Sequence, residues 1–152
     1  MSMETAESFA LWFEGVDVDT ISTAANVRQF FKKDYPKLLR MAGVSGSYVK
    51  SPVLSDEPKA PLFGNSSENK MKKRIYAQQT LECVTRALNA VRYESKQILI
   101  AVYADKLNAW DVCELIGCER AQYQLKKRKA ENEFADAFET CCDWWRDLHV
   151  YK

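Results

Sequence analysis

The sequence of 152 residues contains a single histidine, His149. The chain has five scattered cysteines, an odd number without a CxxC pair: Cys83, Cys113, Cys118, Cys141 and Cys142. Structural zinc sites usually need four Cys or His ligands at short spacings, and a disulfide framework needs paired cysteines. We therefore expect free thiols, no disulfide and no metal site.

Long apolar runs are also missing. No stretch approaches the roughly 18 apolar residues that span a bilayer, and the first residues, MSMETAESFALWFEG, lack the basic start and uninterrupted apolar core of a secretory signal. The sequence therefore predicts a cytoplasmic protein that makes no membrane contact.

The usual catalytic motifs are absent. The sequence contains no Gly-rich phosphate loop, no GxSxG and no HExxH. His149 lies in an aromatic C-terminal tail, with no partner at a spacing that suggests a catalytic pair. We expect neither an enzyme nor a bound cofactor.

What remains is typical of an ordinary globular domain, with 47% apolar and 28% charged residues. The net charge of +1 conceals a local imbalance. Arg120 to Lys129 holds five bases and no acid, whereas Glu131 to Asp147 holds six acids and one base. The distribution of charge can therefore indicate a binding surface although the total cannot.

The first 44 residues predict an N-terminal helical segment. Asp19 or Thr20 can cap a helix that continues through ISTAANVRQFFKK, and Gly43 ends it. Pro36 interrupts the apolar stripe, so it either kinks this helix or starts a second one.

Residues 45–67 contain three of the four prolines and two of the five glycines. Neither a helix nor a central strand fits this composition, so we predict a Pro/Ser-rich extended connection. Its apolar residues indicate that the connection packs along the helices rather than remaining solvated: Tyr48, Val49, Val53, Leu54, Leu62 and Phe63.

Residues 68–93 predict a long amphipathic helix that begins near Ser66 or Ser67 and ends near Arg92. A narrow apolar seam runs along this helix, with residues at alternating spacings of four and three: Ala77, Leu81, Val84, Leu88 and Val91. This period favours packing inside the monomer and leaves a homodimer interface as the alternative. Four bases at the helix start, Lys70, Lys72, Lys73 and Arg74, are more typical of a solvated face than of a binding patch.

Residues 94–152 predict a helix-turn-helix region followed by an aromatic tail. After a helix over about 95–105, Asn108 stands as a cap before a short helix over 109–116, and Gly117 ends that helix. A longer helix starts at Glu119 or Arg120 and runs to the region of Cys141. The short helix, the glycine turn and the long helix together match the helix-turn-helix pattern.

The spacing around Gly117 supports this assignment. Apolar or small residues occupy the five positions at which the two helices should meet: Val112, Cys113, Ile116, Cys118 and Tyr123. The next expected core position holds Lys126, with Leu125 beside it, which leaves the register of the long helix open by about one residue.

The long helix combines a packed face with a polar one. The packed face is expected to consist of Tyr123, Ala130, Phe134, Ala137 and Cys141. Gln and Arg form paired hydrogen bonds with base edges, and Lys and Arg neutralise phosphates. The candidate DNA-binding residues are therefore Arg120, Gln122, Gln124, Lys126, Lys127, Arg128 and Lys129.

Three blocks of the sequence also resemble the ArpU family, the autolysin-regulatory and phage packaging/lysis transcriptional regulators of Gram-positive bacteria and their phages. They are DYPKLLRMAG, SPVLSDEPKAPLFGNSSENKMKKRIYAQQTLECVTRALNAV and ILIAVYADKLNAWDVCELIGCERAQYQLKKRKAENEFADAF. The blocks occur in the family's order and span roughly Asn26 to Phe138.

The resemblance implies a phage or prophage regulator of late genes, with C-terminal helices like the promoter-reading region 4 of sigma factors. It places Arg120, Gln122, Gln124 and Lys127 in the recognition helix, and Trp110 in the supporting helix near the DNA backbone. Glu119 departs from the Ser or Thr that family members usually have at the recognition-helix cap.

Two functions follow as expectations. The first is a sequence-specific transcriptional regulator that binds double-stranded DNA and acts with RNA polymerase at a promoter, with a homodimer as the alternative to a monomer. The second is a helical adaptor that binds another protein through the Leu81–Val91 seam or the Trp144–Trp145 end, without contacting DNA. The terminal aromatic residues themselves are expected to pack as core.

Overall fold

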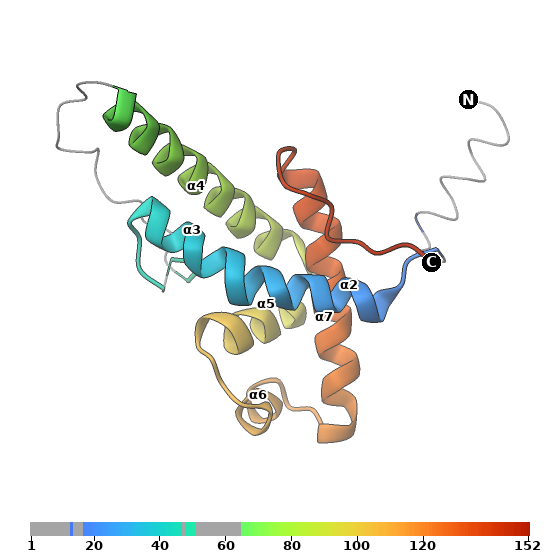
Figure 1. Ribbon diagram of the computed structural model, residues 1–152. Helices are drawn as coiled ribbons and strands as arrows, with labels where there is room; N and C mark the ends of the chain where they lie inside the picture. Colours follow the sequence, from blue (N-terminus) through green and yellow to red (C-terminus); the bar gives the residue numbers. More distant parts are fainter. Residues whose placement is uncertain (1–12, 14–16, 47, 51–64) are drawn as a thin grey trace, which may run out of the picture.

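Figure 1 shows a molecule built from helices, in the computed structural model, which describes residues 13, 17–46, 48–50 and 65–152. The elements in chain order are α2 (Thr20–Gln29), η1 (Phe30–Asp34), α3 (Tyr35–Ala42), α4 (Asn65–Ala90), α5 (Tyr93–Leu99), η2 (Ile100–Ala104), α6 (Ala109–Ile116) and α7 (Arg120–Cys141). Both η elements are π-helical. Within the described ranges there is no strand, only an isolated antiparallel bridge between Val18 and Tyr151. The all-α fold class is confirmed.

The N-terminal helical segment is one helix with a π-helical turn in its middle. Asp19 caps its start by accepting a hydrogen bond from the Ser22 amide at 3.0 Å, and Gly43 ends it with φ of 72°. Pro36 has no N–H to donate to the carbonyl four residues earlier. In η1 the Tyr35 amide already bonds to the carbonyl of Phe30, five residues back. The helix therefore shifts its hydrogen-bond register before Pro36 and continues without a break.

Most of the predicted extended connection, residues 51–64, lies outside the described residues, and with it Val53, Leu54, Leu62 and Phe63. The part that precedes it packs as expected. Tyr48 and Val49 are buried, and the Lys50 ammonium forms an ion pair with Asp105 at 2.8 Å. The connection therefore leaves the first helix along the packed helices rather than away from them.

Helix α4 buries the predicted apolar seam inside the chain. Four of its members are buried and Val91 is partly buried: Ala77, Leu81, Val84 and Leu88. They face α3 and α7, the two helices that pack against α4. The seam therefore packs within the monomer, which was the favoured interpretation, and neither a homodimer nor an adaptor surface can use it without unpacking the core.

The centre of the core is aromatic. The Phe30 ring lies 5.8 Å from Phe134, 5.0 Å from Phe138 and 5.5 Å from Trp145, measured between ring centroids. Phe138 was not among the residues predicted for the packed face of α7, whereas two that were, Ala137 and Cys141, lie at its edge. These rings connect the first helix, α7 and the C-terminal tail into one core.

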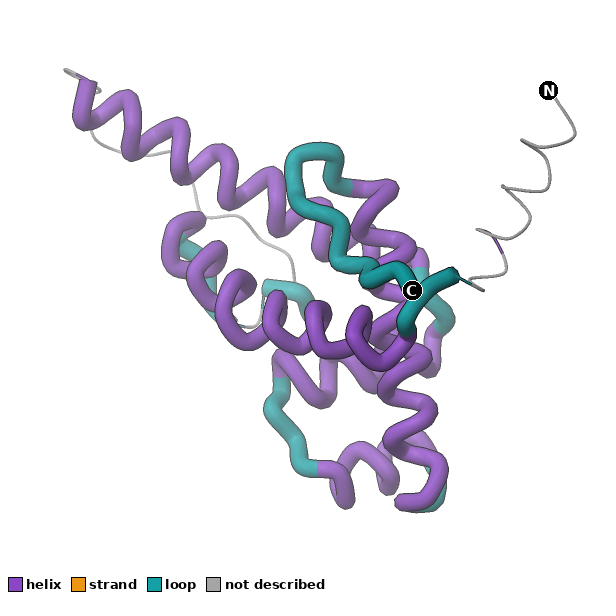
Figure 2. The backbone as a smooth tube through the Cα atoms, turned by 45° about the vertical axis from the view of Figure 1, so that its right-hand side comes forward, coloured by secondary structure: helices purple, strands orange, loops and turns teal. Residues whose placement is uncertain are grey.

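The C-terminal tail runs back beside α7 to the start of α2 (Figure 2). The Asp19 amide donates to the Val150 carbonyl at 2.7 Å, and the Asn26 side chain donates to the Leu148 carbonyl at 3.0 Å. Leu148 is buried and Trp145 is partly buried, whereas Trp144 and Tyr151 are 46% and 45% exposed. The prediction that the C-terminal aromatic residues pack as core is therefore confirmed only for Trp145. The N-terminal aromatic patch lies outside the described residues except for Phe13, which is exposed.

None of the helices in the described part of the chain is both long and apolar enough to cross a membrane.

Candidate nucleic-acid interface

Local capping sets the geometry of the α6–α7 unit. The Asn108 side chain accepts a hydrogen bond from the Asp111 amide at 2.9 Å and so starts α6. Gly117 ends α6 with φ of 69°, a conformation that is costly for residues with a Cβ atom. The Glu119 side chain makes no capping hydrogen bond at the start of α7. The predicted elements are thus present at the predicted residues, with the weak cap where it was expected.

The predicted contact positions around Gly117 do pack together. Val112, Cys113 and Tyr123 are buried, while Ile116 and Cys118 are partly buried against the same core. The short side chain of Cys113 suits the close approach of the two helices, and its thiol is free. The spacing of small and apolar residues therefore identified the packing of α6 on α7 correctly.

Lys126 settles the register of α7. Its ammonium forms an ion pair with the Glu94 carboxylate at 2.9 Å, and its side chain is 34% exposed. Leu125 is instead 66% exposed. The helix therefore places Lys126 at the expected inner position, where a salt bridge to α5 replaces an apolar contact.

Lys127 occupies a different place from the one predicted. Its side chain is only 17% exposed, and its ammonium lies 4.0 Å from a carboxylate oxygen of Glu131. Burial lowers the pKa of Lys127. We had placed this residue at the outer face among the phosphate-binding bases, but the structure turns it toward a buried acid.

Glu131 is a fully buried carboxylate that the sequence did not reveal. Arg28 lies 3.6 Å from it across the α2–α7 contact, and Lys127 lies on its other side. Neither carboxylate oxygen makes a hydrogen bond of ordinary geometry. Burial raises the pKa of Glu131 to about 7. The first acid of α7 therefore lies in the core and not on a solvated acidic face.

The other candidate bases and glutamines remain at the surface. Arg120, Gln122, Gln124 and Lys129 are exposed, and Arg128 is partly exposed. Among the candidates on α7, the structure thus retains these five for an outer face and ties Lys126 and Lys127 to carboxylates. Contact of the five with DNA stays a prediction.

Trp110 joins this surface from α6. It is 67% exposed, and the Arg120 guanidinium lies over its ring at 4.8 Å from the ring centroid. A cation held over an indole ring is attracted by the π-electrons and loses some of its freedom. The contact therefore connects the first turn of α7 to the supporting helix and fixes the direction of one candidate base.

Leu125 also lies on this face, although the sequence alone indicated only that the register of α7 was open near this residue. At about 100° per residue, Gln122, Leu125 and Lys129 fall on one stripe of the helix, with Arg128 beside it. An exposed leucine between polar residues can contact a thymine methyl group in a major groove. Helical periodicity alone would have placed Leu125 outside, had the register been known.

Acids at the edge of the surface limit its positive charge. The span 109–129 contains five bases and three acids, and the acids Asp111, Glu114 and Glu119 are all exposed. The second basic cluster, at the start of α4, lies at the opposite end of the molecule from α6 and the start of α7 (Figures 1 and 2). The two clusters therefore do not form one continuous surface.

The chain is 32% identical over 124 residues to an Enterococcus hirae protein named "Putative autolysin regulatory protein ArpU", covering 80% of this chain and 90% of the relative. The chain belongs to the ArpU family. Residues 64–135 also match a family model described as a protein of unknown function, DUF1492. No solved structure matches the chain.

The segment that matches this family model contains the whole candidate surface. It begins just before α4, includes α5 and α6, and ends within α7 after the exposed glutamines and bases. The ArpU relative covers more of the chain than this model does. The α6 helix and the exposed part of α7 are therefore part of what this chain shares with the proteins of that family model.

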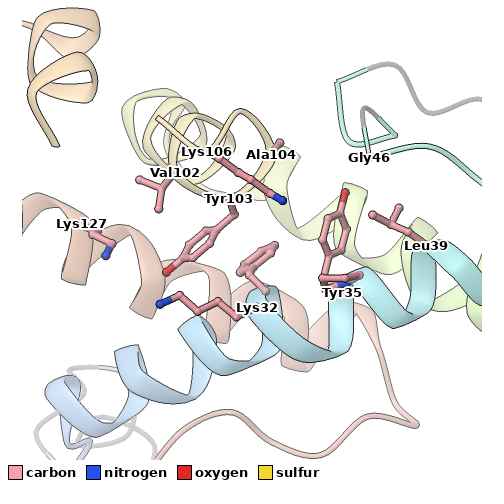
Figure 3. Close-up of a pocket in the computed structure, with 11 residues that line it drawn as sticks. Lys32, Tyr35, Leu39, Gly46, Val102, Tyr103, Ala104, Lys106 and Lys127 are labelled. Carbon is pink, nitrogen blue, oxygen red and sulfur yellow. The ribbon is translucent and has the colours of Figure 1, made fainter. Parts of the chain in front are cut away.

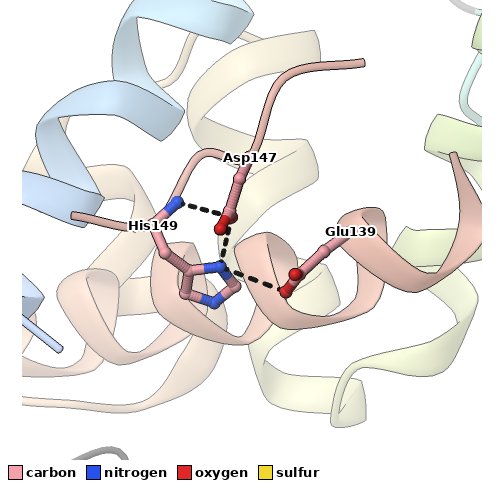
Figure 4. A group of neighbouring side chains, drawn as sticks. All are labelled: Glu139, Asp147 and His149. Atoms are coloured by element: carbon pink, nitrogen blue, oxygen red, sulfur yellow. Dashed lines mark hydrogen bonds and ion pairs between the residues drawn. The ribbon is translucent and has the colours of Figure 1, made fainter. Parts of the chain in front are cut away.

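His149 forms a second cluster of titratable groups in this ArpU-family chain (Figure 4). Its Nδ1 and Nε2 atoms lie 2.6 Å from Asp147 and Asp136, and Nδ1 lies 3.3 Å from Glu139. The hydrogen bond with Asp136, aided by Asp147, raises the pKa of His149 to about 9. The ligand atoms of His149, Asp147 and Glu139 lie within 4.8 Å of one another. The hydrogen bond between His149 and Asp136 anchors the tail to α7.

Proposed function

We propose that this protein is a sequence-specific DNA-binding transcriptional regulator that acts with RNA polymerase at late-gene promoters of a phage or prophage. The observation that carries the proposal is the exposed stripe of Gln122, Leu125 and Lys129 on α7, directly after the α6–Gly117 turn. The regulatory name of the Enterococcus hirae relative supports it. So does the resemblance to ArpU-family regulators, which implies C-terminal helices like region 4 of sigma factors.

In this proposal α7 enters the major groove and α6 supports it. The amides of Gln122 and Gln124 form paired hydrogen bonds with base edges, and Leu125 contacts a thymine methyl group. Arg120, Arg128 and Lys129 neutralise phosphates. Trp110 lies against the sugar-phosphate backbone, where its ring keeps the Arg120 guanidinium directed toward the DNA.

The first test measures affinity for genomic fragments, selected by binding, as a function of salt concentration. Three phosphate contacts predict that log affinity falls with log salt at a slope of about −2.7. Lys129→Gln should reduce the slope by about 1 for all sequences. Lys73→Gln, which removes the same charge from the exposed start of α4, is the matched control and should leave the slope unchanged.

The second test measures sequence preference. Gln122→Ala should cost about 1–3 kcal/mol on the preferred fragment and little on a random one. If Gln122→Ala weakens all fragments equally, α7 does not read bases. If Lys73→Gln flattens the salt dependence as much as Lys129→Gln does, the binding surface is wrongly placed.

A helical adaptor without DNA contact is the second candidate, favoured by apolar side chains that remain exposed on α5 and α6. Tyr93 is 75% exposed and Leu115 is 53% exposed, on either side of a shallow depression. The surfaces named for an adaptor from the sequence fit less well, because the seam of α4 is buried and Trp145 packs on Phe30. An adaptor should retain no bulk genomic DNA at low or moderate salt, which distinguishes the two functions.

A further inference from the structure

A cavity of about 410 Å³ lies between the first helix and the α5–η2 segment (Figure 3). Its volume is within the usual range for small-molecule sites. One wall comes from η1 and α3, the opposite wall from η2 and the residues after it, and α7 contributes Lys127. The cavity is separate from the exposed stripe of α7 that the proposed function uses.

The backbone around this cavity is unusual. Both π-helical turns of the described chain contribute to its walls, η1 through Phe31 and Lys32, and η2 through Val102 and Tyr103. Lys106, at the rim, is the one described residue other than glycine with a positive φ, at 55°. Turns of π-helix are rare and occur frequently at functional sites, and a left-handed lysine costs free energy that packing must offset. Their convergence on one cavity makes this cavity a candidate ligand site.

The polar groups of the cavity suit an anion. Three lysines line it, Lys32, Lys106 and Lys127, and no Asp or Glu does. Within the described chain, neither Lys32 nor Lys106 has a carboxylate at ion-pair distance. Figure 3 shows the Lys32 ammonium directed toward the hydroxyl of Tyr103, and the Lys106 side chain extending over the middle of the cavity.

The remaining walls are flat and apolar. The rings of Phe31 and Tyr103 are stacked at 4.6 Å between centroids, and Phe31 meets Tyr35 edge to face at 5.6 Å. Leu39 and Val102 complete these walls. Such surfaces bind a planar apolar group better than a sugar or another strongly hydrated group.

We propose that this cavity binds a small monoanionic organic acid with a planar apolar body, held by Lys32 and Lys106. A single charge is favoured because Lys127 is already paired with Glu131, which leaves only Lys32 and Lys106 to balance the charge of the ligand. The ligand would bridge the first helix and the segment that leads into α6.

The test is a titration of the full chain with naphthalene-1-sulfonate, followed by amide NMR shifts. A probe of this size should bind with a dissociation constant on the order of 1 mM. Shifts should concentrate at Phe31, Lys32 and residues 102–106. The uncharged 1-naphthalenemethanol should bind at least about threefold more weakly, because it cannot pair with the ammonium groups.

Substitutions locate the charge contacts. Lys32→Gln and Lys106→Gln should each weaken sulfonate binding about three- to fivefold and leave the alcohol unaffected. Lys33→Gln, an exposed neighbour in η1 that does not line the cavity, is the matched control and should change neither. Ala104→Leu should fill space in the cavity and weaken both probes, with thermal unfolding confirming that the variant is folded.

Three results would overturn the proposal. The first is equal affinity for the sulfonate and the alcohol, which would show an apolar cavity with no preference for anions. The second is a shift pattern centred on another surface. The third is binding that Lys32→Gln and Lys106→Gln leave unchanged. None of these measurements uses DNA, so they stand independently of the proposed regulatory function.

Discussion

Replacing the buried Glu131 by glutamine tests how the core tolerates a carboxylate. The native side chain is fully buried and has Arg28 at 3.6 Å and Lys127 at 4.0 Å, but it has no hydrogen bond of ordinary geometry. Its pKa rises from the ordinary 4.5 to about 7, so burial outweighs both cations. Glu131→Gln keeps the shape of the side chain and removes its ionisation.

The sign and size of the effect follow from proton linkage. Because the folded-state pKa is raised, the folded protein holds a proton on Glu131 that the unfolded chain releases between pH 4.5 and about 7. Stability from this group is therefore lost as pH rises through that window. A difference of one in pKa corresponds to about 1.4 kcal/mol, so the full loss is about 3 kcal/mol. Water penetration and movement of Lys127 would reduce it to about 2 kcal/mol.

The assay is urea unfolding followed by helix circular dichroism, for the native chain and Glu131→Gln, at several values from about pH 5 to about pH 8. The free energy of unfolding of the variant, relative to the native chain, should increase by about 2–3 kcal/mol across this range. Taking the difference between the two proteins removes the contribution of the other titrating groups.

Glu133 provides the matched control two residues along α7. Its carboxylate accepts hydrogen bonds from Ser95 and from Arg92, including one from the Arg92 amide, and these outweigh burial and lower its pKa. Glu133→Gln should therefore lose about 1–2 kcal/mol near neutral pH, and less at low pH. A flat difference for Glu131→Gln, or a loss that grows with pH, would show that Arg28 and Lys127 outweigh burial and would refute the reasoning.

The remaining predictions concern the tail and the α6–α7 turn. The ion pairs of protonated His149 contribute stability that is fully present below pH 6.5 and is lost as pH rises to about 9, and His149→Gln should remove it. The contribution should be roughly 1–2 kcal/mol, because the Asp136 partner is exposed. Melting temperatures of both proteins across this pH window measure it. Gly117→Ala should lower the free energy of unfolding, measured with urea, by about 1 kcal/mol. A Cβ atom at this position meets no atom within 4 Å, so only the left-handed backbone conformation opposes the substitution. Gly117→Asn should lower it less.

The elements that the sequence predicted best depend on a residue's own backbone or side chain. Asp19 and Asn108 cap helices with oxygens that reach only two or three residues along the chain. Gly43 and Gly117 adopt positive φ because they lack a Cβ atom. Such signals need no knowledge of the tertiary fold, which is why the bounds of α6 and the start of α7 could be predicted.

The inner face of α7 could be predicted only in part, because charge patterning says nothing about partners distant in sequence. Lys126 forms an ion pair with Glu94 of α5, and Glu131 forms one with Arg28 of α2. A run of bases followed by acids therefore looks like two solvated faces, although Lys126, Lys127 and Glu131 are buried or partly buried. The positions of these distant partners had to come from the fold.

The walls of the cavity illustrate a further limit. Pro36 predicts an interruption of the first helix, but nothing in the sequence distinguishes a π-helical turn from a kink. The second turn, η2, has no proline, and the left-handed Lys106 follows a segment with ordinary helix-forming residues. Backbone features of this kind arise from packing of the two helices against each other and were not predictable residue by residue.

The division of the basic run on α7 also constrains the proposed mode of DNA binding. With Lys126 and Lys127 committed to carboxylates, Arg120, Arg128 and Lys129 remain for phosphates, and three contacts give only a weak, salt-sensitive electrostatic contribution. Specific binders usually make more contacts than this. Under the proposed function, a second DNA-bound protein must then supply the missing affinity through effective concentration. Either RNA polymerase or a second copy of the chain meets this need. The two are separated by measuring, without polymerase, how steeply DNA binding rises with the concentration of this protein. Only a homodimer should make that rise steeper than binding of one chain at a time.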